Sequence, residues 1–278
     1  MPRTPQQRTG VPCERDRDDA RGRGRTDAVP YHRAGPVAWL RINRPDTRNA
    51  LSAEVRAGLW AGIRRFNADD DARVLVLTGT GDKAFCAGGD LKEMAQEQLR
   101  LPPTDFLPQM GRNIDVPKPT IAAVNGVAFA GGFLLAQMCD LVVAAEDARF
   151  AVTEAKVGRG APWAVPLPSL IPPHVAMELL LTAEPIDAER AREVGLVNAV
   201  VPAAELAPHV QALGERIAAN APLSVAASKA TVLLALEQPR REAFDAAEQL
   251  WAPVYGSEDA QEGPRAFREG RAPRWQAR

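Results

Sequence analysis

Two glycine-rich turns are the features of this chain whose residue types and spacing could do chemistry. Both follow apolar runs typical of buried strands, Val74–Thr78 before the first and Ile121–Val124 before the second. Where such a strand ends and a helix begins, unpaired backbone N–H groups project outward and the helix dipole adds positive potential. Two such turns brought together would form a two-donor pocket for an oxyanion, while the alternative for either turn alone is a tight turn between packed elements. Their sequences are Phe85-Cys86-Ala87-Gly88-Gly89-Asp90 and Asn125-Gly126-Val127-Ala128-Phe129-Ala130-Gly131-Gly132.

Several other catalytic patterns are missing from the sequence. There is no G-x-x-x-x-G-K-[ST] phosphate loop and no G-x-S-x-G serine elbow, and Gly158-Arg159-Gly160 lacks the third glycine of a dinucleotide turn. The three histidines lie far from one another without zinc-ligand spacing, so no metal site is predicted. Cys86 and Cys139 have no histidine near them in sequence and are interpreted as small buried side chains.

The composition narrows the classes of partner. A formal net charge of −1 excludes an overall basic field for nucleic acid, and 5% aromatic residues disfavour base-stacking platforms. The chain has no run of about 18 apolar residues and no apolar segment near its start, so neither a membrane span nor a secretory signal is expected. Three widely spaced cysteines do not make a disulfide framework. A cytoplasmic protein without nucleic-acid or membrane partners is therefore predicted.

Strands and helices alternate before residue 202, and only helices follow. Ser52 is interpreted as an N-cap, because Val55, Leu59, Ile63 and Phe66 follow it at helical spacing. This order predicts an α/β core with a helical C-terminal appendage. Strands are predicted over 37–42, 74–77, 121–124, 141–145 and 196–201, and helices over 53–66, 132–138, 175–181, 188–194, 206–217, 222–236, 240–252 and 258–270.

Three regions follow from these patterns. Residues 1–30 mix Arg, Asp, Gly and Pro with almost no large apolar side chain, which predicts a disordered N-terminal extension. Its alternative is a basic arm that binds a partner, and the mixed charges disfavour it. Residues 31–202 form the predicted α/β core with the site. Residues 203–278 form the helical region, whose apolar stripes need a partner surface, either its own core or another chain.

Further motifs accompany the two glycine turns, and they follow one another along the chain. They are Asn43-Arg44-Pro45, Asn49-Ala50-Leu51-Ser52, residues 83–92, residues 119–126, Ala130-Gly131-Gly132, Leu135-Ala136, Cys139-Asp140, residues 188–197, and Glu262-Gly263 with Ala266-Phe267. Taken in order, these motifs resemble the crotonase, or enoyl-CoA hydratase/isomerase, superfamily from about Val37 to the C-terminus. The resemblance implies an α/β crotonase-like (ClpP/crotonase) fold, with a spiral core of ββα units and an α-helical C-terminal trimerisation region. It implies an acyl-CoA substrate, no cofactor beyond the CoA moiety of that substrate, and a homotrimer or dimer of trimers.

The resemblance also assigns residues to a site. By motif position, the backbone N–H groups of Gly89 and Gly131 would hold the thioester carbonyl oxygen, on which an enolate carries its charge. Ala50 and Ala87 would line the CoA moiety. Lys92 would approach a CoA phosphate, and a solvated helix lysine is the alternative for this residue.

The acid/base positions depart from the hydratase pattern. Hydratases of this family use two glutamates that share the water, and those two positions here carry Leu134 and Glu154. Moving a double bond needs only one base, which takes a proton from C2 and returns it to C4, so Glu154 could act alone. Leu134 would exclude water and raise the basicity of Glu154 by desolvation. This single-glutamate pattern resembles that of the 3,2-enoyl-CoA isomerases, so isomerisation is the leading expectation.

Other interpretations stay open. Hydration or dehydration is the alternative if another residue replaces the missing acid, and other enolate chemistry or a non-catalytic acyl-CoA binder are further hypotheses. A peptidase on a related fold would need a Ser–His pair, and no histidine lies in the motif segments. Trp163 either lines the acyl pocket or simply packs.

Overall fold

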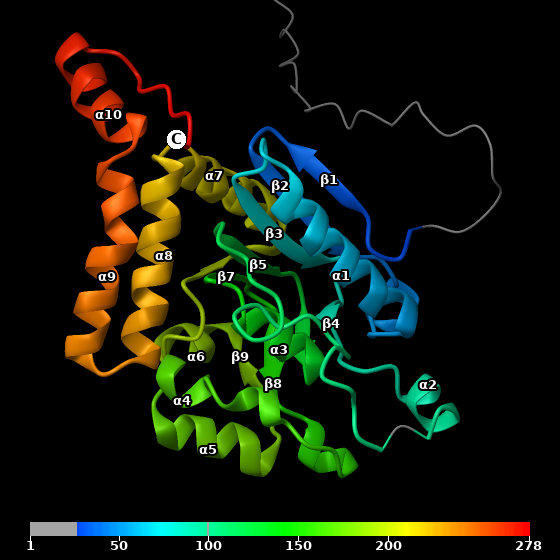
Figure 1. Cartoon of the computed structure of the whole chain (residues 1–278). Coiled ribbons are helices and arrows are strands. Elements are labelled where there is room, and N and C mark those ends of the chain that lie inside the picture. Colours follow the sequence, from blue (N-terminus) through cyan, green and yellow to red (C-terminus); the bar gives the residue numbers. More distant parts are fainter. Residues whose placement is uncertain (1–26, 99) are drawn as a thin grey trace, which may run out of the picture.

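Two sheets form the core of the computed structural model, which describes residues 27–98 and 100–278 (Figure 1). The larger sheet has the strand order β1-β2-β3-β5-β7-β10, and the smaller has the order β4-β6-β8-β9. Pairing is parallel except for β1 with β2 and β8 with β9. The strands are β1 (Tyr31–Ala34), β2 (Val37–Ile42), β3 (Val74–Gly79), β4 (Ala84–Cys86), β5 (Thr120–Val124), β6 (Val127–Phe129), β7 (Leu141–Ala145), β8 (Arg149–Ala151), β9 (Ile186–Asp187) and β10 (Ala199–Val201).

Successive segments of the chain contribute one strand to each sheet. The larger sheet contains β3, β5 and β7, and each is followed along the chain by β4, β6 or β8 of the smaller sheet. Helix α2 (Leu91–Gln96) follows β4, and helix α3 (Gly131–Gln137) follows β6. This repeated step between the sheets is the spiral of ββα units that the sequence resemblance implies, and the α/β architecture is confirmed.

The inner strands of the larger sheet were predictable because both of their faces are covered, whereas the partly exposed edge strand β1 was not predicted. Every residue of β3 and β5 is buried, so these strands are continuous apolar runs. The side chains of Val74 and Val76 belong to one apolar cluster with helix α7 (Leu206–Ala218), while Leu75 and Leu77 belong to another that includes α1 (Ala53–Ala68). Strands β4, β6 and β8 were not predicted, because a strand of three residues shows no periodicity.

Most helices lie where the apolar spacing places them. The side chain of Ser52 accepts a hydrogen bond from the backbone N–H of Val55, which confirms the predicted N-cap of α1. The predicted strand over 196–201 is shorter, because Leu196 and Val197 are buried in the core before β10 begins. The remaining helices are α4 (Leu167–Leu170), α5 (Pro173–Thr182), α6 (Ala188–Glu193), α8 (Pro222–Glu237), α9 (Arg240–Tyr255), α10 (Glu258–Glu269) and the 3₁₀ helices η1 (Pro45–Thr47), η2 (Glu154–Val157), η3 (Pro162–Ala164) and η4 (Ala203–Glu205).

The folded core begins earlier than the predicted boundary at residue 30. The predicted extension lies outside the described residues as far as residue 26, but residues 27–30 are described. Ala28 and Val29 are only 6% and 4% exposed and join the core cluster that includes α1. Two small apolar side chains in a polar stretch carry too little pattern to reveal this packing, so the boundary at residue 30 was wrong.

Beyond α7 the chain is helical, as predicted. Helices α8 and α9 lie side by side, α10 continues from α9, and the C-terminal segment returns toward the end of α7 (Figure 1). The indole N–H of Trp275 donates to the carbonyl of Ala219 at 2.8 Å, which ties that segment down. Among the described residues no single helix is long and apolar enough to cross a membrane; the pair 203–218 and 222–237 reaches that length and hydropathy only across a bend of 105°.

Large apolar side chains are exposed on these last three helices. They are the kind of surface that a second chain covers, but the predicted trimer or dimer of trimers stays a prediction. The side chains are Val232, Leu233 and Leu236 on α8, Phe244 and Tyr255 on α9, and Phe267 on α10.

Candidate active site

The first glycine turn leaves β4 and is held from two directions. The backbone N–H of Ala87 donates to the carbonyl of Arg48 at 3.0 Å, and Leu51 N–H donates to the carbonyl of Gly88 at 2.9 Å. Asp90 then caps α2 and pairs with Arg44 at 3.1 Å, so this carboxylate fastens the turn. Gly88 has a φ of +96°, a conformation that side chains rarely allow.

The second glycine turn leads from β6 into α3. Ala130 precedes the helix with a φ of 51°, and its N–H donates to the carbonyl of Ala151 on β8 at 2.9 Å. Positive φ at alanine is strained and persists only where its surroundings impose it. Gly131 is the first residue of α3, so its N–H has no acceptor within the helix.

The fold brings the two turns into contact. A Cβ atom built on Gly88 would lie 2.8 Å from Ala130 Cβ, 3.0 Å from Phe129 O and 3.5 Å from Gly131 N. In the described part of the chain, neither the N–H of Gly89 nor that of Gly131 donates to a protein acceptor. Two unpaired N–H groups on adjacent turns match the donor arrangement that an oxyanion pocket needs.

Glu154 is a buried carboxyl group at the start of η2, after β8. It is only 9% exposed, and in the described structure its Oε2 has no hydrogen-bond partner. Burial raises the pKa of Glu154, while its own backbone N–H and the side chain of Trp163 act to lower it. A buried carboxyl group that has a raised pKa and one oxygen without a hydrogen-bond partner is suited to exchange a proton.

Leu134 presents no polar group to the site. It lies on α3, one turn after Gly131, and is 5% exposed within the apolar cluster that includes Phe133 and Val152. Position 134 therefore carries a buried apolar side chain, and the single-glutamate site stays a prediction.

Trp163 contributes more than packing. Its ring lies 6.0 Å from that of Phe133, its side chain interacts with the carboxyl group of Glu154, and its carbonyl accepts a hydrogen bond from Gln137 Nε2 at 2.8 Å. Sequence reasoning missed Gln137. The available signal was its amide on the otherwise apolar helix α3, three residues after Leu134 and on the same face.

The residues predicted to line CoA fall into two groups. Ala50 and Ala87 lie close together, because residues 48–51 run beside the first glycine turn. Lys92 is an exposed residue in the first turn of α2. Its approach to a CoA phosphate stays a prediction.

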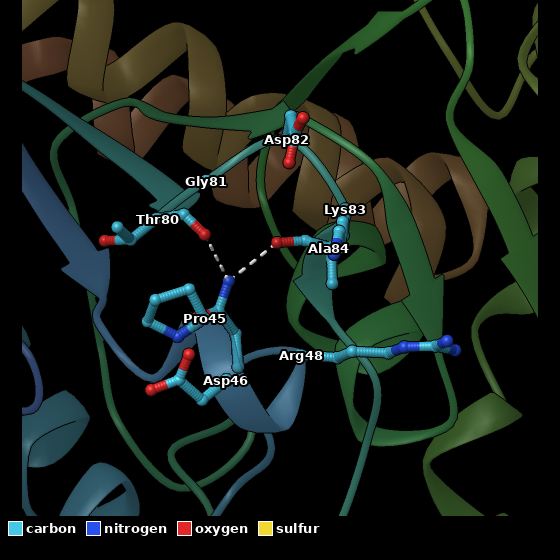
Figure 2. A pocket seen from close by; sticks show the side chains of 9 residues that line it. Pro45, Asp46, Arg48, Thr80, Gly81, Asp82, Lys83 and Ala84 are labelled. Atoms are coloured by element: carbon cyan, nitrogen blue, oxygen red, sulfur yellow. Dashed lines mark hydrogen bonds between the residues drawn. The ribbon is translucent and has the colours of Figure 1, made fainter.

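A separate pocket of about 380 Å³ is lined in part by Arg48 and Asn49, which directly precede Ala50 in the chain (Figure 2). One wall comes from η1 and Arg48, and the facing wall is the loop Thr80–Ala84 between β3 and β4. Asn49 bridges the walls, since its Nδ2 donates to the carbonyls of Thr80 and Ala84 at 3.0 and 2.7 Å. Neither Glu154 nor the two unpaired N–H groups line this pocket, so it is not where the predicted proton transfer occurs.

The remaining nucleophile and metal candidates carry no site. Burial raises the pKa values of Cys86 and Cys139 to about 12, which agrees with their interpretation as inert buried side chains. Across residues 27–98 and 100–278, no group of three His, Cys, Asp or Glu side chains is placed to hold a metal ion.

Comparisons with known proteins give a consistent family. A family model described as enoyl-CoA hydratase/isomerase matches residues 32–278. (E)-benzylidenesuccinyl-CoA hydratase of Thauera aromatica is 41% identical over 249 residues, which span 85% of this chain and 94% of that protein. Carnitinyl-CoA dehydratase of Salmonella typhi is 38% identical over 263 residues, which span 91% of this chain and 100% of that protein. The crystal structure of an enoyl-CoA hydratase from Bacillus anthracis superimposes with a TM-score of 0.84 at 33% identity, covering 90% and 100% of the two chains.

Proposed function

Because this chain belongs to the enoyl-CoA hydratase/isomerase family, we propose that it adds water to, or removes it from, the acyl group of a CoA thioester. The observation that carries the proposal is the buried carboxyl group of Glu154, three residues after Ala151, whose carbonyl accepts a hydrogen bond from Ala130 in the second glycine turn. The curated relatives support the water reaction, since one is named a hydratase and another a dehydratase.

The two glycine turns supply the charge stabilisation. The N–H groups of Gly89 and Gly131 donate to the thioester carbonyl oxygen, which becomes an enolate oxygen as water adds. Donors fixed in advance at that oxygen stabilise the transition state by about 3–4 kcal/mol each. The first N–H of α3 adds the positive end of the helix dipole.

Glu154 supplies the proton transfers. It takes a proton from water while the water oxygen bonds to C3, and the carboxylic acid so formed returns that proton to C2 of the enolate. Because Leu134 cannot hold the water or donate a proton, one carboxyl group serves both halves of the addition. The reverse sequence removes water.

Isomerisation of a 3-enoyl thioester is the second candidate. Leu134 favours it, because a proton shuttle from C2 to C4 needs one base and no water. Sequence reasoning placed this reaction first. The named relatives support the water reaction instead, and the same residues would carry either one.

The reaction is tested with two substrates and the absorbance of the conjugated thioester. With trans-2-enoyl-CoA we expect absorbance to fall as water adds, and Glu154→Gln should abolish the fall. A rise with 3-enoyl-CoA and no change with the 2-enoyl thioester would replace hydration by isomerisation. No change with either would reject both reactions for simple enoyl chains and leave acyl-CoA binding to be measured separately.

Introducing a second carboxyl group should favour hydration. Leu134→Glu is expected to raise the rate of water addition about tenfold, because the new side chain anchors the water that Glu154 activates. The matched control is Leu134→Gln, which holds water at similar volume but exchanges no proton. If the glutamate variant folds and is no faster than wild type, the site does not hold water between positions 134 and 154.

A further inference from the structure

Gln137 is a buried amide whose side chain makes one hydrogen bond to another described residue. Its side chain is on the last turn of α3, is 9% exposed and donates from Nε2 to the carbonyl oxygen of Trp163 at 2.8 Å. A carbonyl oxygen can only accept, so this bond fixes which end of the amide faces Trp163. Oε1 is buried without a partner in the described part of the chain, so the amide is anchored through a single hydrogen bond.

The segment that contains Trp163 is partly exposed. Val157 and Val165 on either side are 51% and 81% exposed, whereas Ala164 and Leu167 are buried. The ring of Trp163 lies against that of Phe133, and its backbone is held by Gln137. Both contacts come from α3, the helix whose first N–H belongs to Gly131.

We propose that Gln137 is a positioning residue, which holds Trp163 so that its indole N–H donates to the carboxyl group of Glu154. This inference rests on the proposed function in assigning the proton transfer to Glu154. One rigid helix then positions both parts of the site, the oxyanion donor at its first residue and, through Trp163, the base at its last.

No charged group accounts for the pKa of Glu154, so the interaction with Trp163 can influence it. Helix α3 and strand β6 carry no charged side chain, and the causes that shift the pKa of Glu154 include no charged group. Its interaction with Trp163 opposes the effect of burial, so losing Trp163 raises the pKa. The charged or titratable groups of neighbouring elements are Arg149 on β8, Lys156 paired with Glu184 at 2.8 Å, Arg159, whose backbone N–H donates to Glu154 O, and Glu178 and His174 on α5.

The test is the pH dependence of Gln137→Met, which keeps the volume and removes the amide. As a base Glu154 must be deprotonated, so kcat/KM falls as the pH drops through its pKa. In Gln137→Met we expect that midpoint to move upward by about half to one pH unit. Trp163→Phe should give the same shift, and the double variant no more than either. Gln211→Met is the matched control, because Gln211 also ties a tryptophan and a backbone carbonyl, at 2.9 and 3.2 Å, far from the site.

A second readout needs no substrate. The indole N–H resonance of Trp163, identified by its absence in Trp163→Phe, should follow the protonation of Glu154, with a higher midpoint in Gln137→Met. If that midpoint and the kinetic one equal those of wild type, while the variant loses only as much Tm as Gln211→Met, Gln137 is merely structural and the proposal is wrong. If neither enoyl thioester reacts but the resonance midpoint moves, the proposed function fails and the positioning role stands.

Discussion

Replacing Glu154 by glutamine is expected to lower kcat by about three orders of magnitude while acyl-CoA binding is retained. General acid–base groups contribute about 10²- to 10⁴-fold to rate, and Glu154 is a buried carboxyl group three residues after Ala151, whose carbonyl accepts from the N–H of Ala130 in the second glycine turn. The oxyanion donors and the binding surface are unchanged in the variant. Turnover on the enoyl thioester and titration with a non-reactive acyl-CoA measure the two quantities separately.

The stability of Glu154→Gln shows whether a loss of kcat comes from lost proton transfer or from a damaged fold. Burial raises the folded-state pKa of Glu154, so its ionised form at neutral pH is less favourable in the folded protein than in the unfolded chain. Removing the charge should therefore leave Tm unchanged or higher. Glu184→Gln is the control, because that side chain is 70% exposed and only pairs with Lys156. Retention of more than a tenth of wild-type kcat by Glu154→Gln would show that another group exchanges the proton.

The second large effect is expected from Gly88→Ala, with a loss in kcat of about a hundredfold. The new methyl group would lie 2.8 Å from Ala130 Cβ and 3.0 Å from Phe129 O, so the two turns must separate. Donors in an oxyanion pocket act over hydrogen-bond distances, and losing one costs about 10²- to 10³-fold. Gly88 supplies neither donor, so the effect reports the distance between the turns.

Backbone strain must be separated from this displacement. Alanine at the φ of +96° also costs about 1–3 kcal/mol of stability. Gly35→Ala is the control, because Gly35 has a φ of 59° in the turn between β1 and β2 with nothing within 4 Å of its added methyl group. Both variants should lose Tm, and only Gly88→Ala should lose kcat. Similar kcat values in the two would mean that the turns do not act together.

Leucine at position 134 gives the proposed site its particular problem, because this position supplies no second carboxyl group. A lone base that serves both halves of a water addition must stay aligned with the enolate as it first accepts and then returns a proton. Leu134 offers no help in this, whereas α3 links the oxyanion donor of Gly131 to Trp163 through Gln137. The alignment of Glu154 therefore depends on a helix that carries no acid of its own.

Long elements with a regular apolar pattern were predictable from the sequence. The helices α1 and α7 and the strands β3, β5 and β7 each bury a face or both faces, and this burial dictates the spacing of their apolar residues. The N-cap Ser52 was equally visible, because capping needs a particular side chain at a particular position. The glycine turns and the departure at Leu134 were visible for the same reason, since they depend on residue type.

The tertiary structure alone decided which of these features meet. Gly88 and Ala130 are in contact because β4 and β6 pair in the smaller sheet, and three-residue strands leave no periodic signal in the sequence. The link from Gln137 to Trp163 ends on a backbone carbonyl, which every residue possesses, so no side-chain pattern could indicate it. The chemistry available at one position depends on the type of residue there, whereas the distance between two turns depends on how whole strands and helices pack.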